Sequence, residues 1–183
     1  VCAGALFCSQ TASAQTRLSV STDITPWLLD GYSAAVMAEG EDLGPWRLTA
    51  EVWGMQMPQF HVELAAGNQG EDWRRRVDWA AVLYTDYHLD QSGVGWHIGG
   101  VVHLMKSTVT RVGKAGEGDL QTFELLARAG YRWFPIEGQG LFINPWLAVG
   151  YLHVIEAPKA VAGEVFEELP AQIFGTLHIG WRF

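Results

Sequence analysis

Apolar and polar residues alternate along eight separate stretches of this chain. Successive side chains of a β-strand point to opposite faces, so an alternation with period two predicts a strand with one apolar and one polar face. The predicted strands are Arg17–Pro26, Tyr32–Glu39, Trp46–Gly54, Val77–Leu89, Val94–Leu104, Leu120–Phe134, Leu141–Ile155 and Gln172–Phe183. The chain shows no helical heptad pattern and no internal repeat, so the alternation predicts an all-β protein.

The last stretch shows the pattern most clearly, because its apolar positions run from Ile173 to Phe183 without a charge. The other apolar faces are also free of charged residues, although these make up 17% of the chain. The opposite faces carry charged residues or histidine and would point into the interior of a barrel. The candidates for this interior network are Glu39, Arg47, Glu51, Asp78, Asp86, His97, Glu124, Arg128, Arg132 and Arg182.

The connections between the predicted strands differ in length in a regular way. Gly40–Pro45, Asp90–Gly93 and Pro135–Gly140 are short and contain turn residues, whereas Met55–Arg76, Met105–Asp119 and Glu156–Ala171 are long. Short turns at one end and long loops at the other are typical of outer-membrane barrels. The exception is Trp27–Gly31, which is short for the long-loop end, so the first strand is the least well defined.

The length of 183 residues suits a single domain. With a net charge of −8, three lysines and no basic cluster large enough to follow the phosphates of a nucleic acid, the chain is not expected to bind nucleic acid. Its apolar runs are shorter than the roughly 18 to 20 residues that a membrane-spanning helix needs, so any span would be built from strands. Aromatic residues are predicted to ring the two edges of the apolar surface. One ring contains Trp46, Tyr87, Trp96, Tyr131, Trp133, Trp181 and Phe183, and the other Tyr32, Trp79, Phe123 and Tyr151.

The segment Val1–Ala14 has no charge and ends in the small residues Ala12–Ala14, a pattern recognised by signal peptidase. We interpret residues 1–14 as part of a signal peptide that is cleaved before Gln15, with a short buried strand as the alternative. Both cysteines, Cys2 and Cys8, lie in this segment, so residues 15–183 are expected to have no disulfide. Acylation of Cys8 is disfavoured because a large residue precedes it.

The chain ends in Gly180-Trp181-Arg182-Phe183. This ending resembles the C-terminal signature of outer-membrane β-barrel proteins, where it is the signal for the barrel-assembly machinery. As a whole, residues 15–183 resemble the small eight-stranded barrels exemplified by the OmpA transmembrane domain, OmpX and OmpW. The resemblance implies an eight-stranded antiparallel up-and-down transmembrane β-barrel in the bacterial outer membrane, surrounded by outer-membrane lipids, with Trp181 and Phe183 as the assembly signal. A soluble barrel shows the same alternation with its faces reversed, but the aromatic rings and the scarcity of lysine favour a membrane barrel.

The interior of an eight-stranded barrel is narrow enough to be filled by side chains, so buried charges should pair. Across the predicted hairpins Glu39 should face Arg47, Asp86 should lie opposite His97, and Arg128 opposite a tryptophan. We interpret this set as a plug, and the alternative is a polar core that conducts protons or ions. His97 and His103 are roughly 20 Å apart along one strand and cannot share a metal ion. No metal or cofactor site is predicted.

An enzyme that modifies acyl lipids would need a serine and a histidine near the outer leaflet. His153 and Glu156 lie near the end of the seventh strand, but the adjacent strand ends carry no serine, and Ser107 follows a strand that is not a neighbour. We therefore predict a non-enzymatic protein with a structural or surface-interaction role. A small-solute channel or carrier of hydrophobic compounds is the second hypothesis, and an acyl-lipid enzyme is the third.

The longest connection, Met55–Arg76, ends in the basic run Arg74-Arg75-Arg76 directly beside Trp73. Such a loop can bind the phosphates of lipopolysaccharide or another external ligand, or it can anchor the barrel at the membrane interface.

Overall fold

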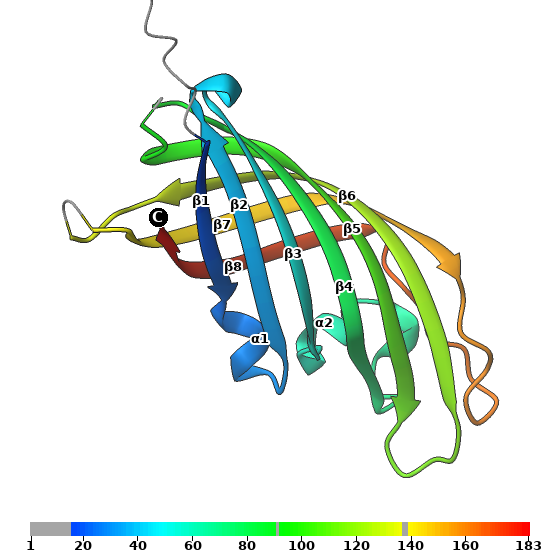
Figure 1. Cartoon of the computed structure of the whole chain (residues 1–183). Helices are drawn as coiled ribbons and strands as arrows, with labels where there is room; N and C mark the ends of the chain where they lie inside the picture. The colour runs from blue at the N-terminus through cyan, green and yellow to red at the C-terminus, as the bar shows by residue number, and fades with distance from the viewer. Residues whose placement is uncertain (1–15, 91, 137–138) are drawn as a thin grey trace, which may run out of the picture.

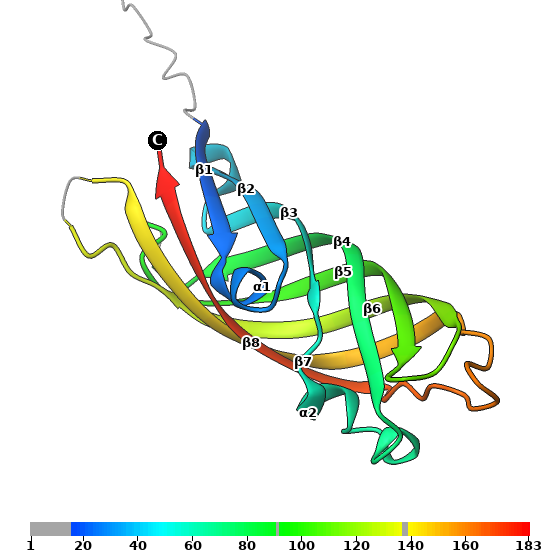
Figure 2. The ribbon, with the colours of Figure 1, turned by 90° about the horizontal axis from the view of Figure 1, so that it is seen from below.

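The computed structural model describes residues 16–90, 92–136 and 139–183, so the predicted signal segment 1–14 lies outside the described residues. It is a closed barrel of eight antiparallel strands in chain order, which confirms the predicted fold (Figures 1 and 2). The strands are β1 (Thr16–Asp23), β2 (Tyr32–Gly40), β3 (Trp46–Gln56), β4 (Trp73–His88), β5 (Gly95–Arg111), β6 (Glu117–Arg132), β7 (Leu141–Glu156) and β8 (Ala171–Arg182). The helices are α1 (Ile24–Leu28) and α2 (Gln59–Val62), and the 3-10 turns are Glu41–Leu43 and Ala66–Asn68.

The two ends of the barrel differ. We call the end that holds the connections 41–45, 89–94 and 133–140 the turn end, and the opposite end, which holds α1 and α2, the loop end (Figure 1). The barrel closes where β1 pairs with β8, with Ser19 opposite Arg182 and Asp23 opposite His178. Closure therefore brings the first and last strands together.

The first strand is shorter than predicted, because a short helix replaces its last residues. We expected it to run to Pro26, but the strand ends at Asp23 and α1 follows. The Asp23 carboxylate accepts a hydrogen bond from the Thr25 backbone N–H at 2.8 Å, which caps the helix. Proline is tolerated in the first turn of a helix because its missing N–H would have no partner there. The helix cap at Asp23 therefore determines the structure of residues 24–26, although their apolar and polar positions continue the pattern of a strand.

The strands at the loop end are longer than predicted. The expected loop Met105–Asp119 is largely strand, because β5 continues to Arg111 and β6 begins at Glu117. The expected loop Met55–Arg76 is also shorter, since β3 includes its first residues and β4 its last ones.

The pairing of β4 with β5 shifts between Val77 and Trp79, which indicates a β-bulge. The bulge turns Val77 inward, although we expected this residue on the outer face.

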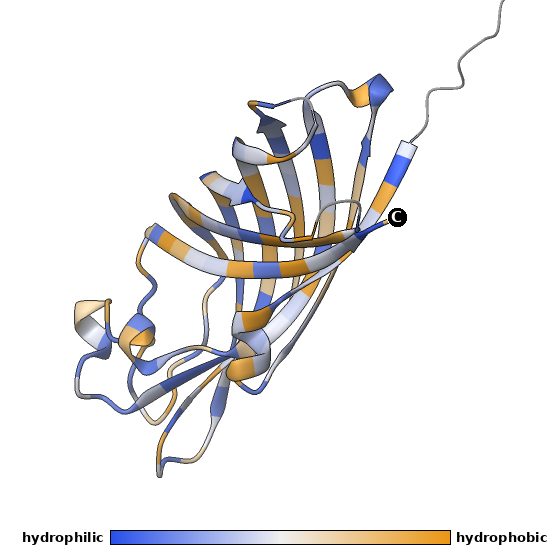
Figure 3. Cartoon of the chain, turned by 90° about the vertical axis from the view of Figure 1, so that its left-hand side faces the viewer, coloured by the Kyte–Doolittle hydropathy of each residue, from blue (hydrophilic) through white to orange (hydrophobic). Residues whose placement is uncertain are grey.

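Apolar residues cover the outside of the barrel, and polar residues alternate with them along the strands (Figure 3). At the turn end Trp46 packs against Tyr87 and Trp96 against Tyr131, each pair with ring centroids 5.2 Å apart. The interior also holds apolar side chains towards the loop end, including Met105 and Val109. Among the described residues, none of the helices has the length and apolar character needed to cross a membrane.

Candidate functional site in the barrel lumen

The turn end of the lumen is closed by one carboxylate among three guanidinium groups. Glu39 lies 2.9 Å from both Arg47 and Arg132, and 3.8 Å from Arg182. The expected contact between Glu39 and Arg47 is present. Arg132 is completely buried, and its guanidinium carbon lies 4.1 Å from the centre of the Phe142 ring. Among the residues that the structure describes in this layer, positive charge exceeds negative charge.

The middle of the lumen contains an ion pair between Arg128 and Asp86. Arg128 donates to both carboxylate oxygens, with Nε 2.6 Å from Oδ1. His97 approaches the same carboxylate, with Nδ1 3.5 Å from Oδ1. The guanidinium carbon lies 4.1 Å from the centre of the Tyr84 ring and 5.3 Å from that of Trp146. Asp86 thus contacts His97, and Arg128 contacts Trp146. The register expected from hairpin geometry is wrong by two residues, however, because Asp86 pairs with Gly99 and Arg128 with Ala148.

Glycine provides the space for this layer. Gly99 pairs with Asp86, and a Cβ atom at residue 99 would lie 2.4 Å from the Asp86 carboxylate. A Cβ atom at Gly130 would lie 2.5 Å from Nε2 of His97. Both distances are far below van der Waals contact. The buried polar side chains therefore fill the lumen up to the backbone of the opposing strands.

A third layer, closer to the loop end, has three carboxylates, Asp23, Glu51 and Glu124. Their only ion-pair partners in the described part of the chain are histidines. His103 Nδ1 lies 2.9 Å from Glu124, and His178 Nε2 lies 3.6 Å from Glu51 and 3.9 Å from Asp23. In this layer negative charge exceeds the fixed positive charge, which is the reverse of the turn end.

Hydroxyl groups donate hydrogen bonds to the carboxylates of the third layer, and α1 lies next to this layer. Ser33 donates to Glu51 at 2.6 Å, and Tyr84 donates to the other oxygen of the same carboxylate at 2.5 Å. Thr176 donates to Asp23. A cavity of roughly 50 Å³ adjoins these groups beneath α1, and its lining includes Asp23, Tyr84, His103, Trp146, Phe174 and Thr176.

The loop end is closed by a pair between Arg75 and Glu168, 2.5 Å apart. Burial raises the pKa of Glu168, although Arg75 acts in the opposite direction. Burial and the charge of Arg75 lower the pKa of His61, which stacks on Phe174 with ring centroids 5.6 Å apart.

The basic run next to this layer does not form one surface. Trp73 and Arg75 point into the lumen, whereas Arg74 and Arg76 are exposed. Arg74 donates to the side chain of Gln59, and Arg76 to the backbone of Asp30 at 3.3 Å. Strand alternation thus divides the basic run between the two faces of β4.

The structure places the other predicted residues as follows. Asp78 was expected in the lumen, but it lies in the bulge of β4, where it accepts a hydrogen bond from Thr108 on the outer face. Trp181 and Phe183 are exposed beside the turn end.

The histidine and serine considered for an acyl-lipid enzyme lie apart. His153 is exposed on the outer face of β7, whereas Ser107 is buried in the lumen beside Arg75. His153 and Ser107 lie on opposite sides of the barrel wall and do not form a catalytic pair.

No protein-family model matches the chain, and no curated protein sequence matches it. The structure is similar to the crystal structure of the N-terminal β-barrel domain of Pseudomonas aeruginosa OprF, with a TM-score of 0.53 and 13% sequence identity over 93% of this chain and 100% of that chain. It is also similar to the crystal structure of Neisserial surface protein A (NspA), with a TM-score of 0.43 and 14% identity over 92% of this chain and 94% of that chain. At this level of identity, the similarity to the OprF domain establishes a shared barrel fold.

Proposed function

We propose that the chain is an outer-membrane β-barrel protein with a structural or surface-interaction role, and that side chains close its lumen. The observation that carries this proposal is the distribution of charge. Ion pairs lie inside the barrel, and apolar side chains such as Leu125 and Val149 are more than half exposed on its outside. In water this arrangement would expose apolar surface and bury charge, whereas in a membrane the apolar surface contacts lipid.

The spacing of the exposed aromatic residues supports the same location. Along β6 the outer face runs from Phe123, near the loop end, to Tyr131, and Trp133 follows in an isolated bridge to Ile143 at the turn end. Ten residues of strand rise about 33 Å. At a tilt of about 40° they span about 25 Å, the height of the apolar band of outer-membrane barrels. Outer-membrane lipids are the proposed surroundings of this band.

A closed lumen is favoured over the second hypothesis, a channel, by the middle layer. Arg128 and Asp86 bind each other directly, and the rings of Tyr84 and Trp146 lie against the guanidinium. The third hypothesis, an acyl-lipid enzyme, has less support because His153 has no serine beside it in the described structure.

We further propose that Trp181 and Phe183 are recognised by the barrel-assembly machinery, and that the exposed Arg74 and Arg76 contact lipopolysaccharide phosphates outside the cell. Contact with an external ligand is the alternative for these arginines, which stand at the border of the connection 57–72. The loop end would then face outward.

Fractionation of a Gram-negative host that exports the chain tests the proposed location and the assembly signal. We expect folded protein, recognised by its heat-dependent electrophoretic mobility, in the outer-membrane fraction. Phe183→Asp should leave unfolded protein in the periplasm at matched expression, whereas Phe60→Asp, which changes an equally exposed aromatic residue at the loop end, should not. Folded wild-type protein in the soluble periplasmic fraction would contradict the location, and equal yields of the two variants would contradict the signal.

A further inference from the structure

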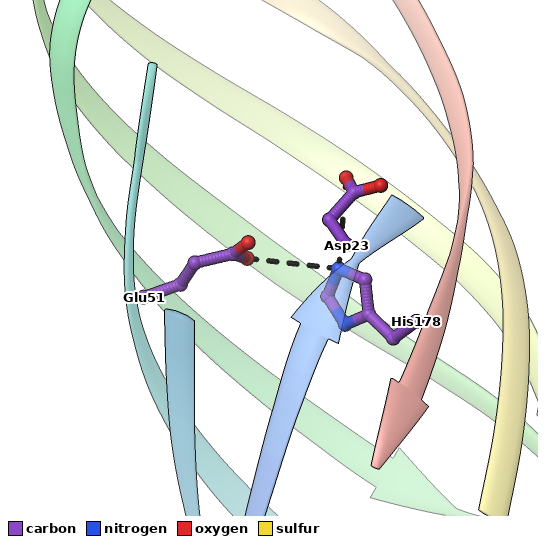
Figure 4. Close-up of side chains that lie close together, drawn as sticks. All are labelled: Asp23, Glu51 and His178. Atoms are coloured by element: carbon purple, nitrogen blue, oxygen red, sulfur yellow. Dashed lines mark ion pairs between the residues drawn. The ribbon is translucent and has the colours of Figure 1, made fainter. Parts of the chain in front are cut away.

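Asp23, Glu51 and His178 come from β1, β3 and β8 and meet in the lumen (Figure 4). Each offers one potential ligand atom, and these atoms all lie within 4.8 Å of one another. The imidazole nitrogen Nε2 of His178 is 3.6 Å from Oε2 of Glu51 and 3.9 Å from Oδ2 of Asp23. All three side chains are buried.

The charges around this cluster are not balanced by fixed cations. The nearest arginine layers have their own carboxylates, with Arg128 bound to Asp86 and Arg75 bound to Glu168. Glu124, close by, adds a third carboxylate that contacts only a histidine among its possible ionic partners in the described residues. Buried carboxylates without a paired cation are costly, so this layer favours a bound positive charge.

We propose that Asp23, Glu51 and His178 bind a divalent first-row transition-metal ion such as Zn²⁺. Imidazole and carboxylate groups together are suitable ligands for these ions. With bonds of about 2.1 Å, the ligand atoms of a tetrahedral site are about 3.4 Å apart. The separations of 3.6 and 3.9 Å from the His178 nitrogen are close to this value, so small side-chain movements complete the geometry.

A second observation points to a ligand at the same place. His103 is 2% exposed, lines the cavity next to Asp23, and its Nε2 atom has no hydrogen-bond partner. Its Nδ1 atom lies 2.9 Å from Glu124. A carboxylate that holds one nitrogen of an imidazole while the other nitrogen faces the metal is the usual arrangement around metal-binding histidines. His103 is not among the side chains whose ligand atoms lie within 4.8 Å of one another, so we assign it a ligand role through water. Asp23 and His103 both line the cavity of roughly 50 Å³, which has room for this water molecule.

The ion leaves the hydrogen bonds of Asp23 in place but displaces one at His178. Oε2 of Glu51 accepts a hydrogen bond from Tyr84 and keeps a second lone pair for the metal. Asp23 uses Oδ1 to accept from Thr25 and Thr176, which leaves Oδ2 for the metal. The N–H of Trp146 donates to Nε2 of His178 at 3.2 Å, and the ion takes the place of this donor when it binds.

Calorimetric titration of the chelator-treated, folded protein in detergent with Zn²⁺ tests the site. We expect one equivalent to bind, and His178→Gln and Asp23→Asn to weaken binding by about tenfold or more. His97→Gln is the matched control, because His97 is equally buried in the lumen but contacts Asp86 and Asn144 instead, and it should bind Zn²⁺ like the wild type. His153→Gln tests an exposed histidine and should also have no effect.

The outcomes separate the proposal from its alternatives. No binding by the wild type, or binding that only His153→Gln removes, would mean an adventitious ion only and would overturn the proposal. If the His178→Gln or Asp23→Asn variants do not regain the electrophoretic mobility of the folded protein, the X-ray absorption spectrum of zinc bound to the unmodified protein tests the site instead. Histidine and oxygen scatterers at about 2.0 to 2.1 Å would support the site. A spectrum with oxygen alone would overturn it.

Discussion

Replacement of Arg128 by leucine is expected to destabilise the folded barrel by about 3 to 5 kcal/mol. The variant leaves Asp86, which is 1% exposed, without the guanidinium that contacts both of its oxygens. In the described part of the chain, His97 is then the only possible cationic partner of this carboxylate, at 3.5 Å. The variant also removes the positive charge from the faces of the Tyr84 and Trp146 rings. An uncompensated buried charge is the main cost.

Two comparisons isolate this cause. Arg182→Leu removes a guanidinium whose side chain is 23% exposed and lies 3.8 Å from Glu39, so we expect a loss of only about 0 to 1 kcal/mol. The double variant Asp86→Leu/Arg128→Leu leaves no buried charge and should be more stable than Arg128→Leu alone. The free energy of unfolding is obtained from urea titrations in lipid vesicles, followed by tryptophan fluorescence. Equal losses for Arg128→Leu and Arg182→Leu, or a double variant less stable than Arg128→Leu, would refute the reasoning.

Two further predictions concern the outer face and the loop end. Leu125→Arg places a charge in the middle of the exposed apolar band and should cost about 2 to 4 kcal/mol in lipid vesicles; an unchanged urea midpoint would reverse our assignment of the two faces. The lowered pKa of His61 means that the folded state prefers the neutral imidazole. Its contribution to stability is complete above about pH 6.5 and is lost as the pH falls through the lowered folded value. His61→Asn should therefore make stability depend less on pH below about 6.5, and identical slopes for the variant and the wild type would contradict this.

The alternation of residues was sufficient to predict the number of strands and most of their faces, with Val77 and Asp78 at the bulge of β4 as exceptions. Of the registers predicted within hairpins, that of β2 and β3 is correct, so Glu39 faces Arg47 across the short turn 41–45. The registers predicted for the β4–β5 and β6–β7 hairpins differ from the structure by two residues.

Contacts across the lumen could not be predicted in this way. Arg128 and Asp86 lie on β6 and β4, which are separated by β5, and they meet only because both point into the same narrow interior. Asp23 and His178 meet because β1 closes on β8. Periodicity assigns a side chain to a face, but the stagger of the strands decides which interior side chains lie at the same height.

The errors at the loop end have local causes. The bulge near Val77 shifts the alternation of β4, so Trp73 and Arg75 fell outside the predicted strand although they follow its inward face. In β5 the alternation continues beyond Leu104, with Ser107 and Val109 pointing inward, but the polar run 106–108 is typical of a loop.

Conductance of the purified protein in planar lipid bilayers tests the closed lumen most directly. Four layers of paired or hydrogen-bonded side chains, around Glu39, Asp86, Glu51 and Glu168, lie between the turn end and the loop end. We expect no steady conductance of porin size, and brief small openings that increase when Arg128 is shortened to alanine. A stable, large conductance of the unmodified protein would contradict the closed lumen and would favour the small-solute channel.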